Sequence, residues 1–225
     1  MQVGDPVGTG AQTKQVVNQQ YQGTPFGSNV LHGGSVTSIA QGQTANTRER
    51  NVVNLRGFKI RVLIKNTWNG GAADRPLFLN FCLISPKHAT TTLTTTDFFR
   101  NPGDLQRAID FDNSFINGFD RGKALGINTD KYALLWKKTM TLGVANSQQA
   151  FSGGAGGPRN YAYFKKYVPI KRQLRFDSGL DTSGFSNIFF IWWVNAIDEG
   201  VGNVSVPGAC DAWARVTTYF REPKN

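Results

Sequence analysis

Basic side chains recur along this chain at spacings that bring them to one face of a β-strand. One group lies within 18 residues and a second on later segments; together they are Arg48, Arg50, Arg56, Lys59, Arg61, Lys65, Lys137, Lys138, Lys171 and Arg175. Clustered Lys and Arg bind phosphates by releasing counterions, with little choice of sequence. Any single member of the set is explained as well by a solvent-facing strand, but the clustering favours contact with nucleic acid.

Aromatic residues interleave with these basic ones. They are Trp68, Trp136, Tyr161, Tyr163 and Tyr167. Exposed rings stack on unpaired bases, whereas buried rings serve the core. The pattern alone leaves both interpretations open for each ring.

The sequence lacks the residue arrangements that commonly form metal sites, phosphate loops or catalytic sites. The two histidines, His32 and His88, have no Cys or carboxylate at metal-ligand spacing. The glycine-rich stretch FSGGAGGPRN lacks the Gly-Lys-Ser/Thr of a phosphate loop. Asp110 and Asp112 could bind calcium, but solvated loop acids are the simpler interpretation. We therefore expect no catalytic residues, no metal and no cofactor, and we expect that the protein is not an enzyme.

The segments that hold the basic residues alternate with a period of two. In RNVVNLRGFKIRVLIKN, Phe58, Ile60, Val62 and Ile64 fall on one face and the basic residues on the other. KKYVPIKRQLRFD and ACDAWARVTTYFRE alternate in the same way. LFLNFCLI is a nearly continuous apolar run that predicts a strand, and the apolar NIFFIWWVNAI predicts a strand buried on both faces. DKYALLWKKTMTLG supplies a sixth strand.

These six strands, with room for two more in the long connections, predict an all-β fold. Long and uneven loops favour a single eight-stranded jelly-roll β-sandwich over the more regular immunoglobulin-like sandwich. We place this shell domain at residues 48–225. Residues 1–47 show no sustained period, so we expect a flexible N-terminal arm there.

Composition agrees with such a domain and bears on its partners. The chain has 225 residues, 25 glycines, 16 phenylalanines and a net charge of +10. Residues 1–47 hold one base, Lys14, and one acid, Asp5, so residues 48–225 carry the whole positive balance. A basic folded domain favours polyanionic partners. Charged residues make up only 18% of the chain, which suggests that other subunits cover much of its surface.

Cys82 and Cys210 lie in apolar contexts, which favours two buried thiols over a disulfide. The first residues lack a secretory signal pattern, and the longest apolar run, Ile188 to Val194, is too short to cross a bilayer. We expect a protein made in the cytosol, with no membrane partner.

Several segments, in this order, resemble a known family. SIAQGQTANTRERNVVNLRGFKIRVLIKN is similar to the start of the jelly roll in capsid proteins of small circular Rep-encoding single-stranded DNA viruses, the circoviruses, the geminiviruses and their relatives. Gln41-Gly42, Arg48, Arg50, Lys59 and Arg61 occupy the places of the family's turn and basic strand. YALLWKKTMTL, KKYVPIKRQLRFD and WARVTTYFRE are similar to later strands, so the resemblance covers about residues 37–222.

The resemblance implies a coat protein that assembles with itself, in about sixty copies, into a small icosahedral shell. It also implies a single-stranded DNA genome bound by inward-facing basic residues, and a location in the virion and in the cytoplasm and nucleus of a host cell. Family members begin with an arginine-rich arm, whereas residues 1–47 here contain only Lys14 as a base. This departure weakens the inference of nuclear entry. Three explanations stay open: the inner faces of the strands neutralise the DNA, packaging is weak, or this chain is part of a longer product.

Two other kinds of protein fit parts of the pattern. A coat protein of a small RNA or satellite virus would share the β-rich pattern, the basic domain and the neutral leader. A carbohydrate-binding β-sandwich would use tryptophans as sugar platforms, but Trp192 and Trp193 lie in the most apolar segment. A cupin-type enzyme would need a histidine-rich metal cluster.

Overall fold

The computed structural model describes residues 15–22, 30–44, 46–67, 75–88, 92–100, 108–113, 116, 120–144, 159–183, 187–196 and 209–223. Strands dominate this part of the chain, as the alternating pattern predicts. The eight main strands are β1 (Gln15–Gln22), β2 (His32–Ser35), β3 (Val52–Asn66), β4 (Leu77–Pro86), β8 (Tyr132–Leu142), β9 (Tyr161–Arg175), β10 (Phe189–Ala196) and β11 (Cys210–Arg221).

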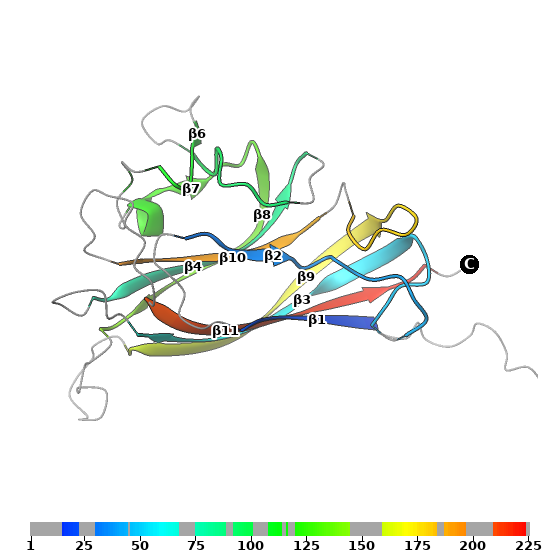
Figure 1. The fold of residues 1–225 in the computed structure, drawn as a ribbon, viewed down its shortest axis with the longest axis horizontal. Coiled ribbons are helices and arrows are strands. Elements are labelled where there is room, and N and C mark those ends of the chain that lie inside the picture. Colours follow the sequence, from blue (N-terminus) through cyan, green and yellow to red (C-terminus); the bar gives the residue numbers. More distant parts are fainter. Residues whose placement is uncertain are drawn as a thin grey trace, which may run out of the picture.

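These strands form two four-stranded antiparallel sheets that pack face to face (Figure 1). One sheet has the order β1-β11-β3-β9 and the other the order β2-β10-β4-β8. Numbered 1 to 8 along the chain, the strands follow the orders 1-8-3-6 and 2-7-4-5, which is the winding of a jelly roll. The prediction of a single eight-stranded jelly-roll sandwich is therefore confirmed.

The two strands that sequence reasoning left for the long connections lie instead within residues 1–47. β1 pairs with β11 from Gln15↔Phe220 to Gln22↔Trp213, and β2 pairs with β10 from Ser35↔Phe189 to His32↔Trp192. The expectation of an irregular arm is thus wrong for residues 15–22 and 32–35. Lys14 and the rest of residues 1–14 lie outside the described residues.

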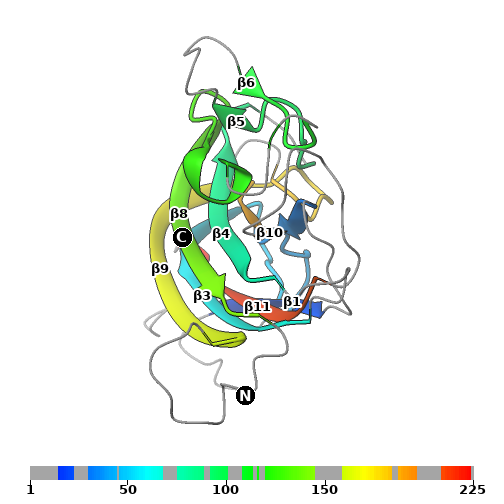
Figure 2. The ribbon, with the colours of Figure 1, turned by 90° about the vertical axis from the view of Figure 1, so that its left-hand side faces the viewer.

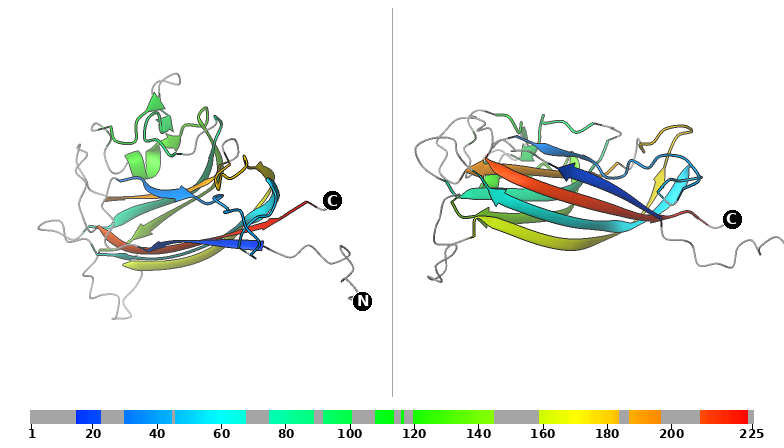
Figure 3. Two further views of the ribbon diagram at one scale, coloured as in Figure 1. Left: turned by 45° about the vertical axis from the view of Figure 1, so that its right-hand side comes forward. Right: turned by 60° about the horizontal axis from the view of Figure 1, so that its bottom comes forward.

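The first hydrophobic core fills the space between the two sheets (Figure 3). Phe58, Ile60, Val62 and Ile64 of β3 point into it, as their spacing predicts, and are completely buried. Alternate residues of β11 and of β10 meet them. Because each strand sends every second side chain inward, its remaining side chains face away from this core.

A second hydrophobic core lies on the other face of the β2-β10-β4-β8 sheet. Phe189, Ile191 and Trp193 of β10 point into it, which explains why this strand is buried at every position. A layer built from the connection between β4 and β8 covers the core. Its elements are β5 (Phe99–Arg100), β6 (Ala108–Ile109), the π-helix η1 (Asp120–Ala124) and β7 (Gly126–Ile127).

The three short strands of this layer form their own small sheet, in the order β6-β5-β7. Figure 2 shows the layer beside one sheet only, while β8 and β9 run along the same edge of the sandwich. Since the covering layer occupies the outer face of one sheet, the outer face of the β1-β11-β3-β9 sheet is the one left without such a cover among the described elements.

Candidate nucleic-acid interface

The outer face of the β1-β11-β3-β9 sheet carries the alternate side chains that the first core leaves out. Directly opposed residues of antiparallel strands share a face, so the register of β3 with β9 and β11 fixes the neighbours. Its basic residues are Arg56, Lys59, Arg61, Lys65, Lys165, Lys171, Arg175, Arg215 and Arg221. Among the described residues of these strands, the acid that the register places on this face is Asp211, opposite Lys65. We call this surface the basic face.

The middle of the basic face is a row of three cations on three adjacent strands. Arg61 of β3 lies opposite Arg215 of β11 and opposite Lys165 of β9. One step along the strand, Lys59 lies opposite Tyr167 and Thr217. Like charges at such positions repel one another, so this row favours an anion laid across the sheet.

Large exposed side chains lie among these cations. Tyr161, Tyr163 and Tyr167 on β9 are 47%, 59% and 47% exposed, and Leu63, opposite Tyr163, is 48% exposed. A core role would bury these rings, so their exposure argues against a core role for them. Rings exposed beside cations suit stacking on unpaired bases.

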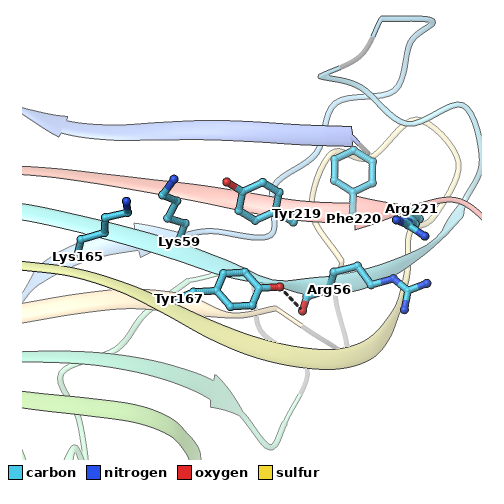
Figure 4. Close-up of a pocket in the computed structure, with 7 residues that line it drawn as sticks. All are labelled: Arg56, Lys59, Lys165, Tyr167, Tyr219, Phe220 and Arg221. Carbon is cyan, nitrogen blue, oxygen red and sulfur yellow. Dashed lines mark hydrogen bonds between the residues drawn. The ribbon is translucent and has the colours of Figure 1, made fainter. Parts of the chain in front are cut away.

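A groove of about 530 Å³ lies at one end of the basic face (Figure 4). It is lined by Arg56, Lys59, Lys165, Tyr167, Tyr219, Phe220 and Arg221. The rings of Tyr167 and Tyr219 pack edge to face, with centroids 6.0 Å apart and an angle of 61° between their planes. The Tyr167 hydroxyl donates a hydrogen bond to the Arg56 carbonyl, 3.0 Å away, which fixes this ring against β3.

The groove exists because of an irregularity in β3. The register with β9 shifts between Leu55 and Gly57, and the register with β11 shifts between Tyr219 and Phe220. Such a bulge turns a side chain out of its regular position, here that of Arg56. Gly57 has a φ of +149° and supplies no side chain between the tyrosines, where a Cβ would lie 2.8 Å from the Tyr167 hydroxyl.

Six of the residues predicted to bind nucleic acid do lie on the basic face. They are Arg56, Lys59, Arg61, Lys65, Lys171 and Arg175. Arg56 and Lys171 also line a second groove of about 240 Å³ beside the first. The period-two pattern predicted this set because β3 and β9 keep their alternation on either side of the bulge.

Arg48 does not lie on the basic face, and its assignment to phosphate is wrong. Its side chain is completely buried, and its guanidinium donates to the carbonyls of Ile39, Arg50 and Leu180 and to the Asn51 side chain. The guanidinium carbon lies 4.3 Å from the centroid of the Phe176 ring. Burial lowers the pKa of this group, and the charges of Asp181 and Glu222 oppose that effect. Because the side chain is completely buried, it is not accessible to a phosphate.

Three other predicted residues also lie away from the basic face. Arg50 is half-buried at one end of the sandwich, where its guanidinium donates to the Pro223 carbonyl at 2.9 Å. Lys137 lies opposite Cys82 in the other sheet, and Lys138 lies opposite Phe81 with its ammonium 5.3 Å from the Phe164 ring centre. The idea that all the predicted bases form one sheet surface is therefore wrong, because β8 belongs to the second sheet.

The structure also adds residues that the prediction did not include. Lys165, Arg215 and Arg221 complete the basic face, and Tyr219 completes the groove. The signal for them was present, since Arg215, Tyr219 and Arg221 alternate along the last strand. Only the pairing of β11 with β3 brings them beside Lys59 and Arg61.

The remaining candidates for chemistry have structural partners. Asp110 accepts a hydrogen bond from the Asp97 backbone at 2.7 Å, and His32 stacks on Trp192 with ring centroids 5.7 Å apart. In the described part of the chain, no three His, Cys, Asp or Glu residues gather as metal ligands would. The glycine-rich residues 151–158 and Trp68 lie outside the described residues.

Within the described ranges, no helix has the length and apolar character needed to cross a membrane.

No protein-family model matches this chain, and no curated protein matches it. Among solved structures, the empty head of turnip yellow mosaic virus is similar over 100% of this chain and 89% of its own, at 14% identity and a TM-score of 0.35. Desmodium yellow mottle tymovirus is similar over 100% and 95%, at 9% identity and a TM-score of 0.37. The 60-mer BFDV capsid protein is similar over 96% of both chains, at 9% identity and a TM-score of 0.25. Likenesses this distant establish no function.

Proposed function

We propose that this protein is a viral coat protein that assembles with copies of itself into a small icosahedral shell around single-stranded nucleic acid. The basic face is the surface that meets the nucleic acid. The observation that carries the proposal is the row of Arg215, Arg61 and Lys165 beside exposed tyrosines, on a sheet face that no described element covers. A protein without a polyanionic partner gains nothing from keeping such like charges side by side.

The finer parts of the proposal follow from the resemblance of the sequence to circovirus-like and geminivirus-like capsid proteins. They are a shell of about sixty copies, a DNA genome and passage through the host nucleus. The basic face itself offers phosphate and base contacts that suit DNA and RNA equally, because a ribose 2′-hydroxyl contact is what separates the two. Single-stranded DNA is the cargo we propose, and RNA is the alternative that the test must separate.

The carbohydrate-binding alternative needs a fully exposed tryptophan, and the described tryptophans are buried or partly buried. Trp192 and Trp193 are 2% and 0% exposed, and Trp136 packs against the first core. Trp213 is partly buried and lies on the basic face, opposite Leu63. A sugar platform needs an exposed ring, and the exposed aromatic side chains of the described strands are tyrosines set among cations. The structure therefore favours a polyanion over a neutral glycan as the ligand of this sheet.

The test is to purify the full-length protein and to examine it by electron microscopy, with absorbance at 260 and 280 nm on the same fraction. We expect uniform shells with a high absorbance ratio, and DNase and RNase digestion then identify the cargo. A protein that stays monomeric across a range of salt and pH would refute the coat-protein proposal.

A pair of triple variants tests the assignment of the basic face. The first triple variant combines Lys59→Gln, Arg61→Gln and Lys165→Gln. It should contain less nucleic acid, and its binding should depend less on salt, because each phosphate that is no longer neutralised removes about 0.7 released counterions. The matched control is Lys87→Gln, Lys123→Gln and Lys137→Gln, which removes three exposed lysines elsewhere. Equal nucleic-acid content in the two triple variants would show that the basic face is not the binding surface.

A further inference from the structure

The four cations of the groove are arranged as two pairs with the tyrosines between them. Figure 4 shows Lys59 and Lys165 at one end and Arg56 and Arg221 at the other, with the rings of Tyr167 and Tyr219 in the middle. The register agrees, because Lys59 lies opposite Tyr167 while Tyr219 lies opposite Gly57 and Arg221 opposite Asn54, farther along β3. Among the described residues, no carboxylate lines the groove.

The space between the two ends is kept open by the backbone. Gly57 is the residue of β3 beneath the tyrosines, and it has no side chain to fill the groove. The Tyr167 ring is held by the hydrogen bond from its hydroxyl to the Arg56 carbonyl. A ring that is fixed before binding loses little conformational entropy when a flat ligand packs against it.

We propose that this groove takes one unpaired nucleotide of a single strand. The base packs against Tyr167 and Tyr219, and the phosphates on either side of it bind the lysine pair and the arginine pair. The volume of about 530 Å³ falls within the range of roughly 300–1,000 Å³ that accommodates small organic ligands. This inference rests on the proposed function and deepens it, since it gives the basic face a site that recognises bases as well as charge.

The arrangement excludes a base pair from the groove. In a duplex the flat faces of the bases are covered by stacking, so the phosphates can meet the cations but a base face cannot meet the tyrosines. A duplex therefore gains the charge contacts and loses the contacts to the tyrosines. The groove distinguishes a single strand from a duplex without reading its sequence, because every base has a flat face.

The experiment measures binding of the purified full-length protein to fluorescent oligomers by anisotropy at two salt concentrations. The probes are dT12, rU12, an abasic 12-mer with the same number of phosphates, and a 12-base-pair duplex. We expect dT12 to bind at least about fivefold more tightly than the abasic 12-mer, because stacking of a base on an aromatic ring has about that effect or more. The dT12 and rU12 probes separate a DNA-specific site from one that accepts both.

Variants locate this preference in the groove. Tyr219→Ala and Tyr167→Ala should remove most of the preference for dT12 over the abasic 12-mer, while salt dependence persists. Tyr167→Phe keeps the ring and should keep the preference. Tyr161→Ala, on the same strand and also 47% exposed in the unaltered protein, should affect the preference less than Tyr167→Ala. Circular dichroism confirms that each variant is folded.

The outcomes separate this inference from the proposed function. Salt-dependent binding with equal affinity for dT12 and the abasic 12-mer would support the basic face as a phosphate-binding surface. It would refute the proposal that the groove binds a base. An equal loss of preference in Tyr161→Ala and Tyr167→Ala would also overturn it, because bases would then stack along the whole strand. Absence of binding to every probe, with no shells, would refute both proposals.

Discussion

Arg61 lies directly opposite Arg215 in the register of β3 with β11. On its other side it lies opposite Lys165 of β9, so one arginine has a cation across from it on each neighbouring strand. Cβ atoms at such positions are about 5 Å apart, and like charges there destabilise a sheet. The folded protein thus holds an unfavourable arrangement of charge that an anion would relieve.

Arg61→Gln should therefore raise the stability of the free protein while weakening its binding to nucleic acid. We expect a gain of about 0.5 kcal/mol in the free energy of unfolding at low salt, which shrinks as salt screens the repulsion. Urea denaturation at low and high salt measures the gain, and anisotropy with dT12 measures binding. Lys87→Gln is the control, since it removes an exposed charge outside the row. A loss of stability in Arg61→Gln at low salt would contradict this account of the row.

Substitution of Arg48, unlike that of Arg61, should lower the stability of the protein, because the Arg48 guanidinium holds parts of the folded chain together. Its guanidinium is enclosed by the carbonyls of Ile39, Arg50 and Leu180 and by the Phe176 ring. Arg48→Gln leaves buried acceptors without donors, so we expect a loss of about 3 kcal/mol in the free energy of unfolding. Urea denaturation measures it, with the exposed Arg175→Gln as control, for which we expect a change within about 0.5 kcal/mol.

The outcome for Arg48 that would contradict the structure is a stable variant with weaker binding to nucleic acid. That result would return Arg48 to the role that sequence reasoning assigned to it. The sequence showed an Arg in a turn before a basic strand, which is a fair signal for phosphate binding. It held no sign that carbonyls from Ile39 and Leu180, nine residues before and 132 residues after, would meet this side chain.

The strands predicted from sequence are those whose own residues alternate or are uniformly apolar. In β3 the alternation alone assigns Ile60 and Val62 to the core and Lys59 and Arg61 to the outside, and the structure agrees. β1 and β2 had no such pattern, because their stability comes from pairing with β11 and β10 rather than from their own apolar residues. In β2, Gly33 takes a φ of +136° against Phe190, where any side chain would overlap the backbone.

The basic face was predicted only in part for a related reason. Alternation within one strand tells which residues share its face, but not which strand lies beside it. Lys137 and Lys59 have similar local patterns, and only the winding of the jelly roll puts them on different sheets. The groove could not be predicted, because it depends on a bulge that brings Arg56 and Tyr219 to one place.

Gly57→Ala tests whether the bulge requires glycine. A Cβ at this position would overlap the Val168 carbonyl oxygen, and the φ of +149° is unfavourable for any side chain. We expect a loss of about 2 kcal/mol or more in the free energy of unfolding, measured by urea denaturation. Two other substitutions divide this loss into its causes.

Gly179→Ala and Gly126→Ala are the matched controls for Gly57→Ala. Gly179 has a φ of +78° with no atom within 4 Å of its Cβ position, so its variant reports the cost of backbone conformation alone. Gly126 also has open space around it, and its variant should be near neutral. A loss in Gly57→Ala no greater than that in Gly179→Ala would mean that the contact with Val168 relaxes easily.

The layer over the second core should depend on Arg121. This side chain is completely buried, its guanidinium donates to the carbonyls of Phe111 and Asn113, each at 3.2 Å, and its own carbonyl accepts from the Trp193 indole at 3.0 Å. Arg121→Leu removes the guanidinium donors from both carbonyls and should loosen the layer while sparing the sandwich. Hydrogen exchange should quicken in residues 108–131 and stay unchanged in β3 and β11.

Lys123→Gln is the control for the Arg121 variant, because Lys123 belongs to the same π-helix and is exposed. It should leave hydrogen exchange in residues 108–131 unchanged. Equally fast exchange in β3 and β11 of the Arg121→Leu variant would show that the layer and the sandwich unfold as one unit.

The two cysteines are free thiols buried in different cores, as their apolar contexts predict. Cys82 points into the second core and Cys210 into the first. Burial raises the pKa of each thiol to about 12; the charge of Lys137 opposes this effect at Cys82, and that of Asp211 adds to it at Cys210. Each thiol therefore keeps its proton in the folded protein at pH values where an unfolded thiol loses it.

This difference should make the protein less stable in alkali. An unfolded thiol titrates near pH 9, so between about pH 9 and 12 the folded state binds more protons than the unfolded state. The free energy of unfolding therefore falls as pH rises, by up to about 1.4 kcal/mol per pH unit for each thiol. Below pH 9 the thiols make no such contribution. Urea denaturation of the wild type and of Cys82→Ala/Cys210→Ala between pH 8 and 11 measures the two slopes, and lysines and tyrosines contribute equally to both. The wild type should fall more steeply above pH 9, and parallel slopes would mean that the thiols ionise as readily in the folded protein as in the unfolded chain.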